Sequence, residues 1–234
     1  MSTNGKIIET INVGRKYELG SEEVVAVQDV NLEVRSGQFI AIVGRSGSGK
    51  TTLLNLIAGL DQATSGTVLF EGKNLAEMNE KELTEIRRHK IGFVFQSFGL
   101  LPLLSAFENV ELPLRISGVK SKEREQRARD SLEMVGLTRR SNHRPYELSG
   151  GEQQRVAIAR AVVTEPPLIL ADEPTGNLDS RNTALLMELL TDLNNEGTTL
   201  ILITHDFEIA SMSARQITLS DGCVEADSAG LSGG

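Results

Sequence analysis

Cysteine is almost absent from the sequence, since Cys223 is the only one among 234 residues. An intramolecular disulfide is therefore excluded, and the composition suits a reducing compartment. No apolar run approaches the roughly 18–20 residues that a membrane-spanning helix requires. The N-terminal segment, Met1 to Lys6, lacks the apolar core of a signal peptide. We therefore expect the chain to stay in the cytoplasm, with no direct insertion into a membrane.

The sequence also lacks an excess of basic residues. Its formal net charge is −8, which argues against a general electrostatic attraction to nucleic acid. The net charge does not exclude a local basic patch. Low-complexity tracts and internal repeats are missing as well. What is present, 39% hydrophobic and 24% charged residues, is ordinary for a soluble globular protein. The length allows one large α/β domain, or a core with a small inserted subdomain.

The N-terminal part of the chain is patterned as strands. Apolar runs predict short strands over 7–8, 24–27 and 30–34, the last with the alternation of a half-buried strand. A continuous apolar run over 39–43 predicts a buried strand, and residues 51–60 have helical spacing.

The rest of the chain changes from mostly helical to alternating strand and helix. Residues 97–165 are expected to be mostly helical, and the charge run of the helix predicted over 121–135 is interpreted as a solvated face. Buried strands are predicted over 168–171 and 200–203, with an amphipathic helix over 182–193 between them. This order predicts an α/β fold with a mostly parallel sheet and right-handed crossovers.

Residues 44–51, Gly-Arg-Ser-Gly-Ser-Gly-Lys-Thr, match the phosphate-loop pattern G-x-x-x-x-G-K-[ST] between a predicted strand and a predicted helix. Glycines let successive backbone N–H groups point at phosphate oxygens, and the helix adds its positive end. Lys50 supplies a charge for the β- and γ-phosphates, and the Thr51 hydroxyl can coordinate Mg²⁺. A Gly/Ser-rich turn is the alternative, but a chance match is on the order of one in a hundred at average residue frequencies. The candidate nucleotide-binding residues here are Gly44, Ser46, Gly47, Ser48, Gly49, Lys50, Thr51 and Thr52.

A second acidic motif follows the strand predicted over 168–171. This strand leads into Asp172 and Glu173, at the strand end where ligands meet parallel sheets. Alone, two acids at a strand end indicate no more than a solvated terminus. Beside a phosphate loop, they predict that Asp172 holds the metal and that Glu173 orients or deprotonates the attacking water.

Residues 148–152, Leu-Ser-Gly-Gly-Glu, form the third motif. Ser149 and Glu152 fit a capping box that opens a helix over 150–163. Gly150 and Gly151 are poor helix formers, and they make sense where a helix N-terminus lies against a phosphate without intervening side chains.

With this third motif the sequence resembles the ABC ATPases, whose signature reads LSGGQ, over essentially residues 7–223. Glu152 stands where Gln is commoner, and Arg45 stands where proline is frequent. The resemblance implies a P-loop NTPase core with an N-terminal antiparallel β subdomain over 1–96 and 166–223. It further implies an inserted helical subdomain with the signature over 97–165. Residues 224–234 are rich in Ser, Gly and Ala and are expected to form a loose tail.

The resemblance also assigns four residues that are ambiguous alone. Tyr17 is implied to stack on adenine. Gln96 is implied to be the glutamine that senses the γ-phosphate and binds the metal, Asp179 to lie in the D-loop at the nucleotide, and His205 to be the catalytic switch histidine. Together with Lys50, Gln96 and Glu173, His205 completes the expected catalytic set.

The mechanism implied by the resemblance is a homodimer that closes around two ATP molecules with Mg²⁺. Ser149, Gly150 and Gly151 of one subunit cover the γ-phosphate held by the phosphate loop of the other. Since phosphoryl transfer needs positioning and charge stabilisation more than covalent help, closure supplies a second helix N-terminus and excludes solvent. ATP hydrolysis loosens the dimer, and this cycle can do work on a partner.

Several stretches resemble one subgroup, which serves lipoprotein-release, macrolide-exporter and FtsX-like permeases. They are IGFVFQ over 91–96, ENVELPL over 108–114 and ADEPTGNLD over 171–179. The expected partner is thus an integral-membrane permease, and we expect Phe98, Leu100 or Leu101 to be exposed until docking. The alternative is a soluble ABC ATPase acting on DNA or ribosomes, which the single cassette and acidic balance disfavour. A regulatory module without turnover is disfavoured by the intact catalytic set.

Overall fold

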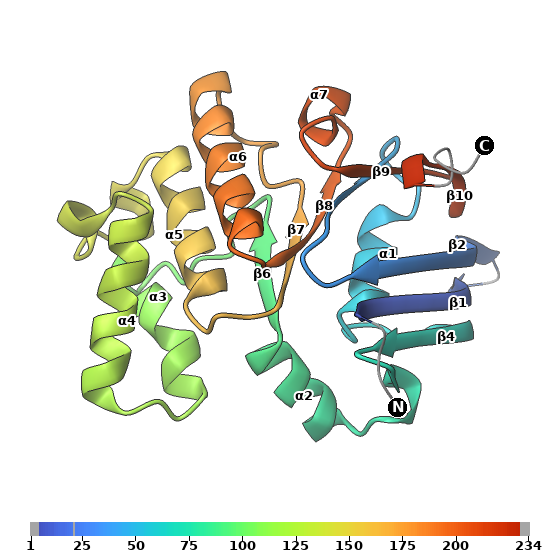
Figure 1. Cartoon of the computed structure of the whole chain (residues 1–234), viewed down its shortest axis with the longest axis horizontal. Coiled ribbons are helices and arrows are strands. Elements are labelled where there is room, and N and C mark those ends of the chain that lie inside the picture. Colours follow the sequence, from blue (N-terminus) through green and yellow to red (C-terminus); the bar gives the residue numbers. More distant parts are fainter. Residues whose placement is uncertain (1–4, 21, 230–234) are drawn as a thin grey trace. The chain divides into compact units, whose positions relative to one another are not determined.

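The computed structural model describes residues 5–20 and 22–229 and divides the chain into two compact units (Figure 1). The first unit holds the described residues up to Thr84 and those from Thr199, and the second holds Glu85–Thr198. Helix α2 (Glu80–His89) runs from one unit into the other. Within the described ranges, every helix is too short or too polar to cross a membrane.

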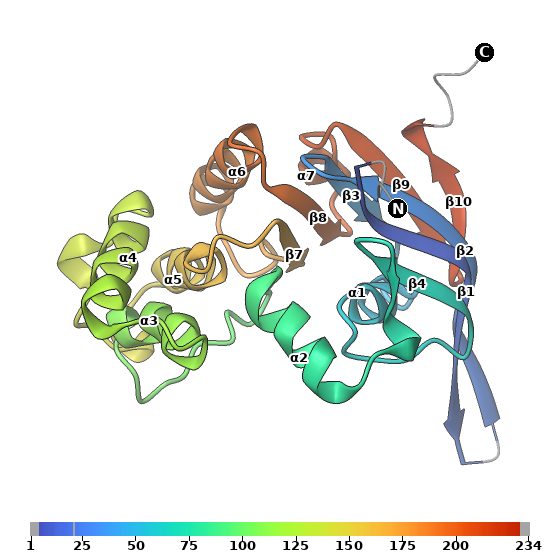
Figure 2. The same ribbon diagram turned by 60° about the horizontal axis from the view of Figure 1, so that its bottom comes forward.

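The first unit contains an antiparallel sheet in the order β2-β1-β4-β5 (Figure 2). Its strands are β1 (Lys6–Leu19), β2 (Glu22–Arg35), β4 (Ser65–Phe70) and β5 (Lys73–Asn74). The short strands expected in the sequence are thus parts of two strands of 14 residues each. Register shifts along the β1–β2 pair interrupt the alternation of apolar residues, which made each long strand look like separate pieces.

A second sheet of the first unit carries the phosphate loop. Strand β3 (Phe39–Val43) is buried throughout and pairs in parallel with β8 (Thr199–Thr204) and with β9 (Arg215–Ser220). Strand β10 (Cys223–Asp227) pairs with β9 in antiparallel fashion. Residues 224–227 therefore form a sheet edge and not the loose tail expected from their small residues, while residues 230–234 lie outside the described part.

Short helices complete the first unit. Helix α1 (Lys50–Ile57) follows the phosphate loop and packs against β2 and β4, as Figure 2 shows. The 3-10 turn η1 (Leu75–Glu77) follows β5, and helix α7 (Phe207–Ala210) packs against β3 and β8. An α/β fold with an antiparallel β subdomain is thus confirmed.

The second unit combines a parallel strand pair with a helical cluster. Strands β6 (Ile91–Phe95) and β7 (Leu168–Asp172) pair in parallel, and α5 packs against β6. The helices are α3 (Ala106–Ile116), α4 (Ser121–Met134), α5 (Gly150–Val162) and α6 (Ser180–Asn195), with 3-10 turns η2 (Thr138–Arg140) and η3 (Pro145–Glu147). Residues including Val110, Leu132 and Val156 form an apolar core between α3, α4 and α5. The boundaries expected at 97 and 165 stay a prediction, because the compact unit also includes β6, β7 and α6.

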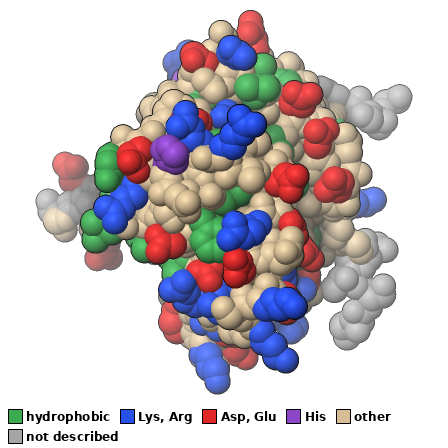
Figure 3. Space-filling view, turned by 90° about the vertical axis from the view of Figure 1, so that its left-hand side faces the viewer, with side chains coloured by type: hydrophobic (Ala, Val, Ile, Leu, Met, Phe, Trp, Pro, Cys, Tyr) green, Lys and Arg blue, Asp and Glu red, His purple; other side chains and the backbone are tan. Residues whose placement is uncertain are grey.

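The outer surface of the helical cluster is mixed in charge. Figure 3 shows basic and acidic side chains interspersed on this face. On α4, Arg129 pairs with Glu125 one turn earlier, and both side chains are exposed. Such exposed pairs contribute at most about 0.5 kcal/mol each. Arg124 and Arg127 of the same helix are half-buried and bind Glu111 and the Val163 carbonyl, so the charge run is a solvated face only in part.

Candidate nucleotide-binding site

The phosphate loop has left-handed backbone, which other residues adopt far less readily than glycine, at two of its glycines. Gly47 and Gly49 have φ of 81° and 96°, in the left-handed region. A Cβ on Gly49 would lie 2.1 Å from the carbonyl oxygen of Ala26, and one on Gly44 would lie 2.2 Å from that of Leu219. Side chains at 44 and 49 are therefore excluded by neighbouring backbone. At Gly47, in contrast, a Cβ would meet no atom within 4 Å, so this glycine faces open space.

The loop closes around the side chain of Lys50. Its Nζ donates to the carbonyl oxygens of Gly44 at 2.7 Å and of Arg45 at 2.9 Å, and the residue is buried. The backbone N–H of Gly222, in the turn between β9 and β10, donates to the carbonyl of Ser48 at 3.1 Å. A fixed ammonium group at the start of a helix, ringed by loop amides, is a site for a polyphosphate.

His205 follows β8 at the same sheet edge from which the phosphate loop departs. Val43 is the register partner of Thr204 in the parallel pair of β3 and β8, so Gly44 and His205 both follow directly. The Thr204 hydroxyl accepts a hydrogen bond from the Asp206 N–H at 3.0 Å, which turns the chain after the strand. The first unit thus places an exposed histidine beside the loop.

Tyr17 lies on β1 in a polar cluster that the sequence did not reveal. Its hydroxyl donates to Asp61 Oδ2 at 2.7 Å, and the Arg15 guanidinium carbon lies 4.5 Å from the ring centroid. Arg15 also pairs with Asp61 at 2.8 Å. Burial disfavours the charged Asp61 carboxylate, but the bonds from Tyr17 and the Gln62 amide and the charge of Arg15 together lower its pKa. The ring is therefore held at both its face and its hydroxyl.

In the second unit, Gln96 and Glu173 leave the sheet at one edge. Phe95 is the register partner of Asp172 in the parallel pair of β6 and β7, and the two residues follow it. Glu173 has φ of 47° and its carbonyl accepts from the Gly176 N–H at 3.1 Å, which makes a tight turn after the strand. Left-handed backbone at a non-glycine residue is a feature that often marks functional sites.

The Gln96 segment is held by two side chains from other elements. The Asn177 side-chain amide donates to the Gln96 carbonyl at 2.9 Å, and the Gln154 amide of α5 donates to the Phe95 carbonyl at 3.3 Å. A Cβ on Gly176 would lie 2.7 Å from Gln96 Nε2, so the glutamine side chain lies directly over this glycine. The sequence motifs contain these residues but not their contacts.

The capping box predicted at the start of α5 is present. The Ser149 N–H donates to Glu152 Oε2 at 2.8 Å, and the Glu152 N–H donates to the Ser149 hydroxyl at 3.3 Å. Gly150 and Gly151 form the first turn, and Ser149 is exposed. The capping box thus uses the N–H groups of Ser149 and Glu152, while Gly150 and Gly151 add no side chain between the first turn and an anion.

Asp179 caps the next helix of the second unit. Its carboxylate Oδ1 accepts from the N–H of Asn182 at 2.8 Å and from the Asn182 side-chain amide at 2.9 Å. The hydrogen bond from the Asn182 N–H is the main reason that the pKa of Asp179 is lowered. Asp179 is exposed, and its role in the structure is to begin α6.

The observed residues fit ATP and Mg²⁺. Lys50 places a positive charge at the start of α1, and a Cβ built on Gly47 would meet no atom within 4 Å, so the loop leaves room there for phosphates to approach its backbone. No cluster of three or more His, Cys, Asp or Glu able to hold a metal occurs among the residues at 5–20 and 22–229. Mg²⁺ at such sites uses one or two protein oxygens together with substrate phosphates.

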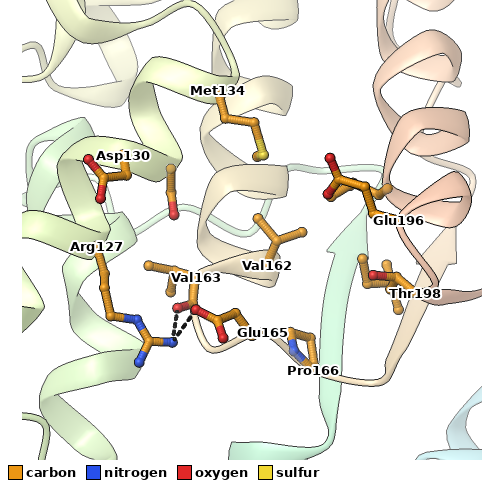
Figure 4. Close-up of a pocket in the computed structure, with 12 residues that line it drawn as sticks. Arg127, Asp130, Met134, Val162, Val163, Glu165, Pro166, Glu196 and Thr198 are labelled. Atoms are coloured by element: carbon orange, nitrogen blue, oxygen red, sulfur yellow. Dashed lines mark hydrogen bonds and ion pairs between the residues drawn. The ribbon is translucent and has the colours of Figure 1, made fainter.

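A hollow of about 350 Å³ lies elsewhere in the second unit, between α4 and the last turns of α5 and α6 (Figure 4). None of the predicted site residues lines it. There Arg127 donates to the Val163 carbonyl at 2.8 Å and pairs with Glu165 at 3.2 Å. Arg127 thus binds an open carbonyl at the C-terminus of α5, which is the end opposite to the glycines. The hollow is explained by helix termini and not by the nucleotide chemistry.

The fold and these motifs define the class of phosphate-loop nucleotide-binding proteins. The model of the ABC transporter family matches residues 27–176. An ABC transporter ATP-binding protein of Thermotoga maritima is 48% identical over 94% of both chains. The ABC transporter ATP-binding protein MJ0796 of Methanocaldococcus jannaschii is 50% identical over 94% of this chain and 95% of that protein.

Solved structures agree with these sequence relatives. A dimeric post-hydrolysis structure of the ATP-binding cassette MJ0796 with ADP and Pi has a TM-score of 0.88 at 47% identity, covering 94% of this chain and 97% of the other. The cbiO1 protein of Clostridium perfringens, part of the transporter complex cbiONQ, has a TM-score of 0.85 at 28% identity over 95% and 88%. The chain belongs to the ABC transporter ATP-binding family. It is an ABC-type ATPase whose substrate is ATP and whose metal is Mg²⁺.

Proposed function

We propose that this ATPase works as a homodimer that closes around two ATP molecules and drives an integral-membrane permease. The observation that carries the proposal is the start of α5, where a capped helix exposes Ser149 and half exposes Gly150, with Gly151 buried behind them. Such an N-terminus binds anions, and a second copy of the chain offers a phosphate loop that lacks this cover. The dimeric MJ0796 structure with ADP and Pi, from a relative about half identical to this chain, supports the arrangement.

Each site residue then has a chemical role. Backbone amides of residues 44–49 and the Lys50 ammonium bind the phosphates, with Ser46, Ser48 and Thr52 beside them. Thr51, Gln96 and Asp172 hold Mg²⁺, which when bound neutralises charge on the phosphate oxygens. Tyr17 stacks on adenine. Its fixed ring costs little entropy on binding, because Arg15 and Asp61 already hold it.

Hydrolysis requires a water placed in line with the γ-phosphate. Glu173, on its left-handed turn after β7, orients this water and accepts its proton. His205 donates a hydrogen bond to the developing charge, and Gln96 reports the state of the phosphate to the segment that follows it. In the partner, Ser149, Gly150, Gly151 and Asp179 complete the enclosure and exclude bulk water.

The subgroup that we favour serves FtsX-like permeases, in export, lipoprotein release or force transmission without transport. The segment after Gln96 supports permease docking, since Leu101 is 45% exposed and Leu103 is 80% exposed. Phe98 and Leu100 are half-buried, so of the three candidates only Leu101 is fully available. Docking there would hold the chain on the inner face of the cell membrane. The competing soluble role on DNA or ribosomes has no comparable support, because the helical face in Figure 3 mixes both charges.

The first test is Glu173→Gln. We expect hydrolysis to fall by about 10³-fold or more, because the water loses its base while ATP binding is retained. The variant should elute at twice the monomer mass with ATP and at the monomer mass with ADP. Glu188→Gln, an exposed change on α6, serves as the matched control and should hydrolyse ATP like the wild type. A Glu173→Gln protein that turns over ATP normally, or stays monomeric with ATP, would contradict the proposal.

The second test addresses the docking surface. Leu103→Glu, alone and with Leu101→Glu, should abolish the stimulation of hydrolysis by the co-reconstituted permease, because a carboxylate would be desolvated in the interface. Hydrolysis by the isolated subunit should stay unchanged. Leu60→Glu, at an exposed leucine of the first unit, is the control and should leave the stimulation intact. Loss of hydrolysis in the isolated variants would contradict a role confined to permease docking.

A further inference from the structure

The two glycines at the start of α5 have different surroundings. A Cβ built on Gly151 would lie 2.2 Å from Asn182 Oδ1 and 2.4 Å from Asn182 Cγ, distances that real Cβ atoms do not reach. A Cβ on Gly150 would make only ordinary contacts, at 3.7 Å to Phe98 and 3.8 Å to the Asn177 carbonyl. A side chain at 151 would therefore have to displace the amide group of Asn182, whereas a side chain at 150 would displace nothing.

Asn182 is itself held firmly on both sides of its amide group. Its Nδ2 and its backbone N–H donate to Asp179 Oδ1 at 2.9 and 2.8 Å, in the first turn of α6. Its Oδ1 accepts from Arg155 at 3.4 Å, and Arg155 lies one turn after Gly151 on α5. One side chain therefore joins the capping residue of α6 to the glycine turn of α5.

We propose that Asn182 is a positioning residue that locks the signature turn (residues 149–152) and the D-loop (residues 177–179) into one rigid lid. This inference rests on the proposed function, in which both segments reach the nucleotide of the partner subunit. When the dimer closes, the two segments arrive together because Asn182 fixes their spacing. Gly151 lacks a side chain so that Asn182 can pack on it, whereas Gly150 lacks one so that a phosphate can approach.

The test is a set of variants in the full chain. Gly151→Ala should lower kcat about 10²-fold, because displacing a catalytic element by about 1 Å costs that much. Asn182→Ala should lower kcat about tenfold and leave the KM for ATP unchanged, since a lid contact made only in the closed state affects turnover and not ground-state binding. In the double variant the clash is gone, so kcat should return to the level of Asn182→Ala.

Gly150→Ala is the matched control. Its loss of activity comes from crowding at the partner's phosphate, and Asn182→Ala should not improve it. The proposal is overturned if the Gly151→Ala/Asn182→Ala protein is as slow as Gly151→Ala. It is also overturned if Asn182→Ala turns over like the wild type, or raises KM as much as it lowers kcat.

A second readout separates this inference from the proposed function. Urea unfolding should show that Gly151→Ala destabilises the monomer and that Asn182→Ala relieves the destabilisation, whether or not the protein hydrolyses ATP. Failure of Glu173→Gln to dimerise with ATP would remove the proposed function and the role of the lid in it, but not the packing of Asn182 on Gly151. Additive destabilisation by Gly151→Ala and Asn182→Ala would sink the packing claim alone.

Discussion

At the scale of single residues, Glu152 shows why the signature can end in glutamate. The side chain closes the capping box with Ser149 and lies 3.2 Å from Arg140. Hydrogen bonding to the Ser149 N–H, against a smaller effect of burial, lowers the pKa of Glu152. A glutamine could make the same box, so the charge adds an interaction with the helix N-terminus and with Arg140.

Glu152→Gln should therefore reduce stability by at most about 1 kcal/mol at pH 7, because one exposed charge interaction is lost and the box is kept. A lowered pKa contributes stability above the ordinary value of 4.5 and loses it as pH falls through the folded value. The difference between variant and wild type should shrink accordingly below pH 4.5. Urea unfolding at several pH values measures this, and a difference that grows on acidification would refute the assignment.

At the scale of an element, the docking segment owes its shape to one buried residue. Asn109 of α3 is fully buried, and its Oδ1 accepts from the Leu101 N–H at 2.8 Å. Its Nδ2 lies 3.0–3.1 Å from the carbonyl oxygens of Leu101, Leu104 and Ser105. Hydrogen bonds from the buried Asn109 side chain thus hold the backbone of the segment that carries Leu101 and Leu103.

Asn109→Ala should destabilise the chain by about 1–3 kcal/mol, because several buried backbone groups lose their partner. Stimulation by the permease should fall as the segment loosens, while isolated hydrolysis changes little. Ser105→Ala removes only the cap of the same helix and should cost about 1 kcal/mol. Chemical denaturation and the reconstituted ATPase assay provide both numbers, and normal stimulation in Asn109→Ala would disconnect this segment from docking.

At the scale of the whole molecule, ATP contributes to stability by mass action. A ligand present at about 100 times its Kd stabilises the folded state by about 2.7 kcal/mol. If two chains enclose two ATP molecules, the apparent stability also depends on protein concentration. The net charge of −8 opposes the approach of two such chains at low salt, so the nucleotide interactions must exceed this repulsion.

For Glu173→Gln with ATP and Mg²⁺, Tm should rise with protein concentration, whereas with ADP it should not. The reason is that only the triphosphate joins the two subunits in the proposed dimer. Differential scanning fluorimetry across a hundredfold range of protein concentration measures the effect. Lys50→Ala is the control, because it should lose the stabilisation by either nucleotide. A Tm independent of concentration with ATP would contradict closure of a dimer.

The phosphate loop, the acidic strand end, the capped glycine helix and the α/β class can all be predicted from the order of the residues alone. These features depend on local spacing, because adjacent residues specify a strand, a glycine turn and the start of a helix. Even the capping box of Ser149 and Glu152 was predictable, since both partners lie within one turn. The long strands β1 and β2 were predicted only in pieces, because bulges break the alternation.

The distant residues that support the local motifs become known only from the folded chain. Asp61 beneath Tyr17, Asn177 on the Gln96 backbone and Asn182 against Gly151 are separated from their partners by 31 to 81 positions. The partner of a polar residue cannot be predicted from the sequence when the two are this far apart along the chain, because their hydrogen bond depends on how strands and helices pack. Gly151 is the clearest case. The motif identifies this glycine in the sequence, but the Asn182 side chain that a Cβ would meet there belongs to another helix.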